Sequence, residues 1–327
     1  MRELQDILAQ LCASDTPTVL ATLAEVEGSS YRRPGARMLV AGGRRTGSIS
    51  GGCLEEDLVC RARSVAATGK PELVVYDTAA ENDIVWGVGL GCHGVVRILL
   101  ERLPPRPAWA SALAENMKAG RPTHVDVVWG GAPGEAGTRL SPPGTAAGPG
   151  VFRQAVLPPP ALAIFGAGDD AQPLFRLARE LGWTATVADP RPALPTRRRF
   201  PGAFALVLGP SEELVARAAP PPGSLAVVMT HHYRHDVPII RTLLPMDLAY
   251  VGLLGPRKRA ERILADVEAS GLQVTPAMKG RLRAPVGLDL GADAPEEVAL
   301  SIIAEMTASL AGRDGRPLRL RERPIHV

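Results

Sequence analysis

A glycine-rich turn that ends in a cysteine is the first segment of this 327-residue chain whose residue types suggest chemistry. Ser50, Gly51, Gly52 and Cys53 stand directly before a segment in which apolar residues recur at helical spacing. The dipole at the start of a helix favours a thiolate there, and the glycines would leave the thiol accessible. Two interpretations stay open: a reactive sulfur that carries a persulfide or contacts a metal, and a small apolar residue in a tight turn.

A second cysteine, Cys92, lies in another glycine cluster directly before His93. Its surroundings are similar to those of Cys53, but no clear helix follows it. Adjacent Cys and His residues have poor geometry for zinc, and the sequence offers no second pair, so no structural zinc site is predicted. Cys60 lies on the helix that follows Cys53 and is expected to pack within it.

A later glycine-rich turn reads G-x-G-x-x-A and follows an apolar run. In a dinucleotide-binding fold Gly166 would make the tight turn, Gly168 would let the backbone approach a phosphate, and the helix start would attract an anion. Asp189 stands 21 residues after Gly168, where an acid can bind a ribose hydroxyl. The acidic pair Asp169-Asp170 would repel phosphate at the same place. The pattern predicts a nucleotide or pterin-phosphate site, with a glycine turn kept only for packing as the alternative.

Histidines follow another apolar run of the second half. His231 comes first, with His232 and His235 behind it. Because strand ends at the carboxyl edge of a parallel sheet line the ligand crevice, we favour a role for His231 as a proton donor, a metal ligand or a phosphate partner. The alternative is a polar loop that happens to hold three histidines. The arginine run at 197–199 is expected to lie on the surface.

The elements that would position these residues fall into two units joined by a linker. The linker is predicted at residues 130–160, which hold seven Gly and seven Pro in 31 residues. The first unit, residues 1–129, is predicted as a smaller α/β domain with helices at 4–12 and 54–66 and strands at 19–25, 36–41, 73–76 and 95–100. The second unit, residues 161–327, is predicted to have strands at 161–165, 184–188, 204–208 and 225–229 and helices at 173–181, 211–219 and 295–310. Its alternation of strands and helices predicts an α/β, Rossmann-like, doubly wound parallel sheet.

The composition is that of an ordinary globular protein. Hydrophobic residues make up 46% and charged residues 22% of the chain, and the net charge is only +3. That charge is too small and too dispersed for a dedicated nucleic-acid-binding protein. No stretch is long and apolar enough to span a membrane, the first residues lack the apolar core of a signal peptide, and four cysteines do not make a disulfide scaffold. We therefore expect a reduced, cytoplasmic protein with neither nucleic-acid nor membrane partners.

Several motifs spread over the chain resemble those of the XdhC/CoxI family, accessory proteins for molybdenum hydroxylases such as xanthine dehydrogenase. In the first half these motifs are GSS at 28–30, RPGARM at 33–38, GSISGGCLE at 47–55 and GLGC at 89–92. In the second half they are IFGAG at 164–168, DPRP at 189–192, MTH at 229–231, GLLG at 252–255 and PVGLDLG at 285–291. Two positions depart from the family pattern: His93 replaces a glycine, and Ala294 replaces a threonine that would cap the helix at 295–310.

The resemblance implies a protein that binds the molybdenum cofactor (molybdopterin) as cargo. Such a protein would assist sulfuration of the metal by a cysteine desulfurase and deliver the cofactor to the large subunit of a molybdenum hydroxylase. We expect a homodimeric chaperone with little turnover of its own. On this hypothesis the first-unit residues that contact the cofactor are Ser50, Gly51, Gly52, Cys53 and Cys92, with Cys53 as the sulfur or molybdenum contact. The second-unit residues that hold its phosphate or nucleotide are Gly166, Gly168, Asp189, Arg191 and His231.

Two alternatives from other functional classes stay open. The G-x-G-x-x-A turn with Asp189 and His231 also fits an NAD(P)-dependent oxidoreductase, although that function leaves the first unit without a role. Cys53 also fits a sulfur-transfer enzyme that carries a persulfide through a catalytic cycle.

Overall fold

The chain divides into two compact units, Met1–Pro158 and a second unit that begins at Pro159. Each unit has its own hydrophobic core, so each is described by itself. The computed structural model describes residues 1–77, 94–130, 134–141, 144 and 146–322.

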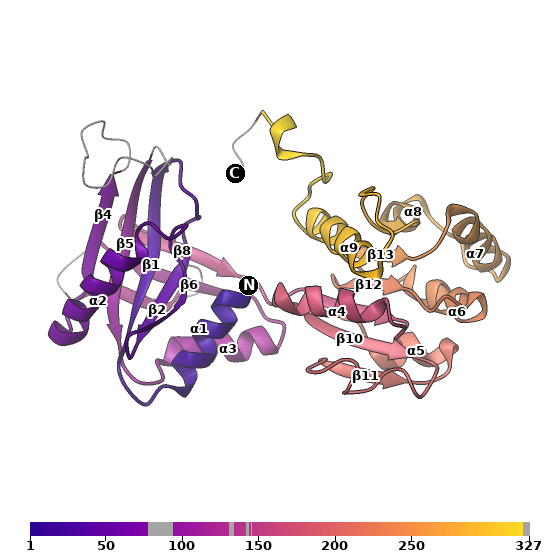
Figure 1. Cartoon of the computed structure of the whole chain (residues 1–327), viewed down its shortest axis with the longest axis horizontal. Helices are drawn as coiled ribbons and strands as arrows, with labels where there is room; N and C mark the ends of the chain where they lie inside the picture. The colour runs from indigo at the N-terminus through magenta and orange to yellow at the C-terminus, as the bar shows by residue number, and fades with distance from the viewer. Residues whose placement is uncertain (78–93, 131–133, 142–143, 145, 323–327) are drawn as a thin grey trace. The chain divides into compact units, whose positions relative to one another are not determined.

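The first unit combines two antiparallel sheets with helices (Figure 1). Its described helices are α1 (Arg2–Ala13), α2 (Glu55–Thr68) and α3 (Ala108–Lys118). Its described strands are β1 (Thr18–Gly28), β2 (Arg37–Ala41), β3 (Arg44–Gly47), β4 (Glu72–Asp77), β5 (Gly94–Leu103), β6 (Thr123–Val128), β7 (Gly137–Leu140) and β8 (Val151–Val156). Within these residues the larger sheet has the order β3-β2-β1-β5-β4 and the smaller one the order β7-β6-β8.

Alternation along β1 explains how the larger sheet is covered. Successive side chains of a strand point to opposite faces. Ala21 and its neighbours of the same parity pack with the apolar side of α2. Leu20, on the other face, packs with α1 and α3. The helix starting at Glu55 is therefore seated directly on the sheet, which fixes the loop that precedes it.

Residues 130–160, which the sequence predicts to be a linker, contain two strands of the smaller sheet. Strands β7 and β8 lie inside residues 130–160, and both pair with β6. Some of the glycines that suggested a linker serve this pairing: the backbone N–H of Gly130 donates to Gly150 O, and a Cβ on Gly150 would lie 2.6 Å from the Cα of Gly130. The break between the units falls at Pro158 and Pro159, near the end of the expected linker.

The second unit is an α/β domain built on one parallel sheet (Figure 1). Its described strands are β9 (Ala161–Phe165), β10 (Thr184–Asp189), β11 (Ala205–Leu208), β12 (Leu225–Val228), β13 (Tyr250–Leu253) and β14 (Leu282–Arg283). Its described helices are α4 (Ala171–Glu180), α5 (Ser211–Ala218), α6 (Tyr233–Leu243), α7 (Arg257–Ala269), α8 (Pro276–Arg281), α9 (Pro295–Leu310) and the 3₁₀ turn η1 (Leu318–Leu320).

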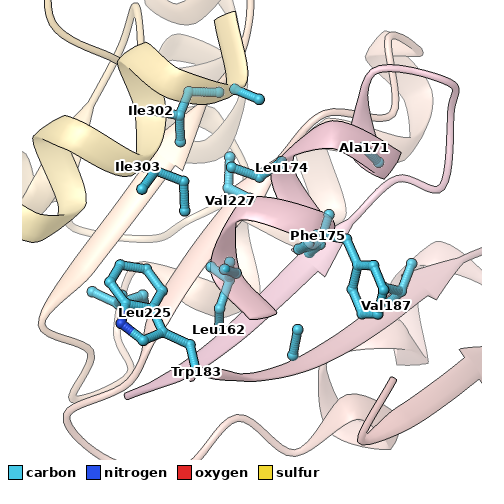
Figure 2. Packing of buried hydrophobic residues seen from close by; sticks show 14 of the residues in the cluster. Leu162, Ala171, Leu174, Phe175, Trp183, Val187, Leu225, Val227, Ile302 and Ile303 are labelled. Atoms are coloured by element: carbon cyan, nitrogen blue, oxygen red, sulfur yellow. The ribbon is translucent and has the colours of Figure 1, made fainter. Parts of the chain in front are cut away.

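The order of the strands confirms the Rossmann-like prediction. The sheet runs β11-β10-β9-β12-β13-β14, which is the order 3-2-1-4-5-6 of dinucleotide-binding domains. Helices α4 and α9 cover one face, where Leu174 lies beside Ile303 and Val227, and Phe175 lies toward Val187 (Figure 2). Helices α5, α6 and α7 cover the other face. The order reverses between β9 and β12, and ligands of such sheets bind beyond the carboxyl ends of the strands at that point.

Candidate functional site

A buried carboxylate shapes the loop that carries Cys53. Glu55 Oε1 accepts hydrogen bonds from the backbone N–H groups of Ile49 (3.1 Å) and Ser50 (2.8 Å), and Oε2 accepts one of 2.5 Å from the Ser50 hydroxyl. Ser50 Oγ in turn accepts hydrogen bonds from the backbone N–H groups of Gly52 (3.1 Å) and Leu54 (3.2 Å). Burial raises the pKa of Glu55, but these hydrogen bonds outweigh burial and hold the pKa below its ordinary value. The loop is therefore fixed from within by an ionised side chain.

This arrangement leaves Cys53 exposed. Gly52 has φ +123°, which favours glycine, and a Cβ added there would meet nothing within 4 Å. The hypothesis of a buried, purely packing Cys53 is therefore wrong. Helix α2 begins two residues later, with Leu54 at its N-cap, as the dipole argument requires. Its first turn is acidic, however, and those carboxylates oppose a negative charge on the thiolate.

Two further cysteine predictions have different outcomes. Cys60 is exposed on α2, so the expectation that it packs within the helix is wrong. The cause is the turn of the helix: Leu58 and Ala62 take the buried positions on either side of it. Cys92 lies outside the described residues, together with the glycine cluster around it.

In the second unit, Gly166 allows the turn after β9 to lie directly against the end of the neighbouring strand β12. Its φ is +120°, and a Cβ there would lie 2.4 Å from the carbonyl oxygen of Met229, directly after β12. The backbone N–H of Gly166 donates to Ala188 O, at the end of β10. Gly168 follows, and a Cβ on it would lie 2.7 Å from Asp170 Oδ1. The glycine turn therefore joins three strand ends within a few ångströms.

Asp189 is fully buried and fully bonded in this structure. Its Oδ2 accepts hydrogen bonds from the backbone N–H of Ala167 and from Arg191 Nη2, both at 2.7 Å. Its Oδ1 accepts two of 2.8 Å, from the backbone N–H and the Nε of Arg191. Burial raises the pKa of Asp189, but the hydrogen bonds outweigh it and the pKa lies below its ordinary value. With about four acceptor sites filled, the carboxylate orients Arg191 and the glycine turn and has no capacity left for a ribose hydroxyl.

The acidic pair at the helix start is held by neighbouring side chains. Asp170 Oδ2 lies 2.6 Å from Nε2 of His231, which has a left-handed backbone with φ 61°. Asp169 Oδ1 accepts a hydrogen bond of 2.9 Å from Arg199, which also donates to the carbonyl oxygen of Ala167. Arg199 is partly exposed and lies against the glycine turn, whereas Arg197 and Arg198 are exposed as expected. The distance in sequence between Arg199 and the glycine turn concealed the contact.

A second polar group supports the end of β12. Asp236 is buried on α6, accepts a hydrogen bond of 2.6 Å from the Thr230 hydroxyl, and also accepts one from Arg259. Arg259 lies on α7 and also contacts the carbonyl oxygen of His231 at 3.4 Å. The structure thus brings the predicted residues of the second unit together: Gly166, Gly168, Asp189, Arg191 and His231. Sequence reasoning missed Arg199 as a member of this group.

Neither a metal cluster nor a membrane-spanning helix occurs in the part of the chain that the structure describes. Among those residues no group of three or more His, Cys, Asp or Glu side chains is placed to hold a metal ion. None of the helices in the same ranges is long and apolar enough to cross a membrane.

Comparisons with known proteins agree on one family. The family model described as the XdhC Rossmann domain matches residues 162–306, and that of the XdhC and CoxI family matches residues 11–77. A Bacillus subtilis protein named as a probable subunit of xanthine dehydrogenase is 34% identical over 94% of this chain and 97% of its own length. The Escherichia coli molybdenum cofactor insertion chaperone PaoD is 25% identical over 89% of this chain and 82% of its own length.

A solved structure extends the agreement to the fold. The crystal structure of a protein from Bacillus halodurans described as a xanthine dehydrogenase matches with a TM-score of 0.80 and 30% identity, covering 97% of this chain and 99% of its own. The likeness in sequence and in fold therefore runs through both units. This chain belongs to the XdhC and CoxI family.

Proposed function

We propose that this protein is an accessory factor that binds the molybdenum cofactor as cargo and delivers it to a molybdenum hydroxylase of the xanthine dehydrogenase type. Membership of the XdhC and CoxI family supports this, and so does the similarity to PaoD, which is called an insertion chaperone for the same cofactor. The large subunit of the hydroxylase is the partner in this proposal. A binding and delivery protein accounts for both units, whereas an oxidoreductase uses only the second.

The observation that carries the proposal is the exposed thiol of Cys53 on a rigid loop. A thiolate is the form of cysteine that binds metals and attacks sulfur. Here the buried hydrogen bonds between Ser50 and Glu55 hold the loop in one conformation. Little conformational entropy of the loop is therefore lost when the Cys53 thiol binds a ligand. In the proposed function Cys53 contacts the molybdenum centre, with Gly51 and Gly52 giving the cargo close access to the backbone. Cys92 belongs to the same proposed contact.

The crevice of the second unit is the proposed site for the phosphate or nucleotide end of the cargo. Gly166 and Gly168 lie at the start of α4, where backbone N–H groups attract anions. Arg191, aimed by Asp189, and His231 are the proposed partners of the phosphate. Asp189 then acts by positioning Arg191.

The hydrogen bonds that Asp189 already accepts argue against the alternative of an NAD(P)-dependent oxidoreductase. NAD-dependent Rossmann enzymes use an acid at this place for the ribose hydroxyl. Here that acid already accepts four hydrogen bonds. This favours the delivery function over nicotinamide binding.

Reconstitution of a purified apo-hydroxylase tests the delivery function directly. Molybdenum cofactor and a cysteine desulfurase with its cysteine substrate would be supplied with and without this protein, and hydroxylase turnover measured. We expect turnover to depend on the protein in a ratio near one protomer per hydroxylase site, with light scattering giving a homodimer. Equal reconstitution in its absence would reject the proposal. Catalytic turnover of persulfide far above one per protomer would favour the sulfur-transfer alternative.

A further inference from the structure

The first unit contains a pocket of about 540 Å³ that is separate from the contacts proposed so far. It lies between the start of α1, the turn at residues 31–37 and the end of β8. Its volume falls within the range of about 300–1,000 Å³ typical of small-molecule sites. The pocket adjoins the loop of Cys53: Tyr31 lines it, and a Cβ on Gly51 would lie 4.0 Å from the Tyr31 ring.

A buried arginine lines this pocket. Arg37 is 4% exposed, and its Nη1 donates to Gln154 Oε1 (2.7 Å) and to the carbonyl oxygen of Gly35 (3.1 Å). Its Nε and Nη2 have no hydrogen-bond partner in the described part of the chain. Leaving buried donors of a charged group unpaired costs free energy, so such a side chain normally has a partner. Gln154, which holds the guanidinium, lines the same pocket.

The protein itself supplies little counter-charge to Arg37. The acid that interacts with it is Glu101, which is buried and whose carboxylate already accepts hydrogen bonds from the backbone N–H (2.9 Å) and the hydroxyl of Thr138. Burial raises the pKa of Glu101 and lowers that of Arg37 to about 10. Glu101 leaves the Nε and Nη2 of Arg37 without a hydrogen-bond partner in the described residues.

The other charged groups of the pocket are mainly basic. Arg32 lines it and bonds both Glu3 and the Ser48 hydroxyl (2.9 Å), so its guanidinium is fixed in place. Arg33 also lines it. Three arginines thus face one lining carboxylate, that of Glu3. Guanidinium groups in such a cluster match the geometry of carboxylates and phosphates.

We propose that this pocket binds the oxyanion end of a small molecule, a phosphate monoester or a carboxylate, with Arg37 as the buried cation and Arg32 and Arg33 at its entrance. The anion would accept hydrogen bonds from Arg32 and Arg33 and would neutralise the charge of Arg37, whose enclosed Nε and Nη2 have no partner in the described part of the chain. The site belongs to the first unit, and its existence does not depend on the identity of the cargo.

Calorimetry of the full-length protein with sodium phosphate and with sodium acetate, each at constant ionic strength, tests this site; phosphate binding that the Arg37→Gln variant retains unchanged is assigned to the site proposed in the second unit. We expect saturable binding of at least one anion, weakened at least tenfold by Arg37→Gln, which removes the buried charge, and less by Arg37→Lys, which keeps it. Arg44→Gln, an exposed arginine on β3, is the matched control and should bind as the parent does. Tighter binding of phosphate assigns a phosphate monoester, and tighter binding of acetate assigns a carboxylate.

Absence of saturable binding of both anions, or equal binding by the parent and the Arg37 variants, would overturn the proposal. Circular dichroism checks that the Arg37 variants fold. If they do not, Arg33→Gln decides, because it changes an exposed side chain: at least threefold weaker binding supports the site, and unchanged binding refutes it.

Discussion

Glu55 shows how one buried side chain organises a loop. An acid in the first turn of a helix usually stabilises the helix dipole. Here the carboxylate instead turns back and accepts hydrogen bonds from Ile49 and Ser50 in the preceding loop. The residues between, including Cys53, are thereby held at the surface. Rigidity at Cys53 therefore depends on Glu55.

We expect Glu55→Gln to lower the free energy of unfolding near neutral pH by about 1–3 kcal/mol, since charge-assisted hydrogen bonds are lost. The folded-state pKa of Glu55 lies below its ordinary value, so the ionised form stabilises the fold above a pH of about 4.3, the unfolded pKa. That stability is lost as the pH falls through the lower folded value. Urea unfolding at several pH values should therefore show the gap to the parent closing in acid. Glu56→Gln, an exposed neighbour, is the control; a gap independent of pH contradicts the account.

At the residue scale, the sequence predicted which side chains belong to the candidate site. It predicted less well which hydrogen bonds those side chains make. The glycines next to Cys53 indicated an accessible thiol, and the thiol is exposed. The role of Asp189 differs from that of a ribose acceptor because Arg191, two residues away, fills its carboxylate. Arg199 reaches the glycine turn through the fold, a contact that no local pattern encodes.

At the scale of elements, the turn after β9 requires glycine at position 166. We expect Gly166→Ala to cost about 3 kcal/mol or more, because the new Cβ would combine unfavourable φ with a contact of 2.4 Å to Met229 O. Gly223→Ala separates the two effects, since Gly223 has φ +74° with nothing within 4 Å of a Cβ. That control should cost only about 1–2 kcal/mol. Equal losses in denaturant unfolding would show that packing at Gly166 is unimportant.

Helix α9 lacks a side-chain N-cap at Ala294. Glu297 partly compensates, since its carboxylate accepts hydrogen bonds from the backbone N–H groups of Asp293 (2.9 Å) and Ala294 (3.1 Å). A serine would add the missing acceptor for the first turn. We expect Ala294→Ser to raise the free energy of unfolding by about 1 kcal/mol in urea titrations. Ala311→Ser, at the other end of the helix, should give no gain; a gain there or none at Ala294 would contradict this explanation.

Element prediction succeeded where hydrophobic pattern and flanking turns agreed. Strand β9 and helix α9 have the predicted bounds, because an apolar run and a Pro start, respectively, mark them clearly. It failed for β7 and β8, where Gly and Pro dominate the composition but the strands are completed by pairing with β6. Sheet pairing with β6 overrides local propensity there.

At the scale of the whole molecule, the chain has one candidate cargo contact in each unit. The loop of Cys53 belongs to the first unit and the turn of Gly168 to the second. If both contribute to one function, a substitution in either should weaken binding of the same cargo. Gly168→Asp adds a carboxylate beside Asp170 at the proposed phosphate site, so its effect should grow with the charge of the phosphate end.

Anaerobic binding of the molybdenum cofactor to the purified protein tests the central claim most directly, with NADH and NADPH titrated in parallel. The account predicts a dissociation constant of about 1 μM or tighter for the cofactor and no saturable binding of either nicotinamide. Cys53→Ser should weaken cofactor binding at least tenfold, while Cys60→Ser, another exposed cysteine of the same region, should leave it unchanged. Nicotinamide binding without cofactor binding, or a Cys53→Ser protein that binds the cofactor as tightly as the parent, would contradict the account.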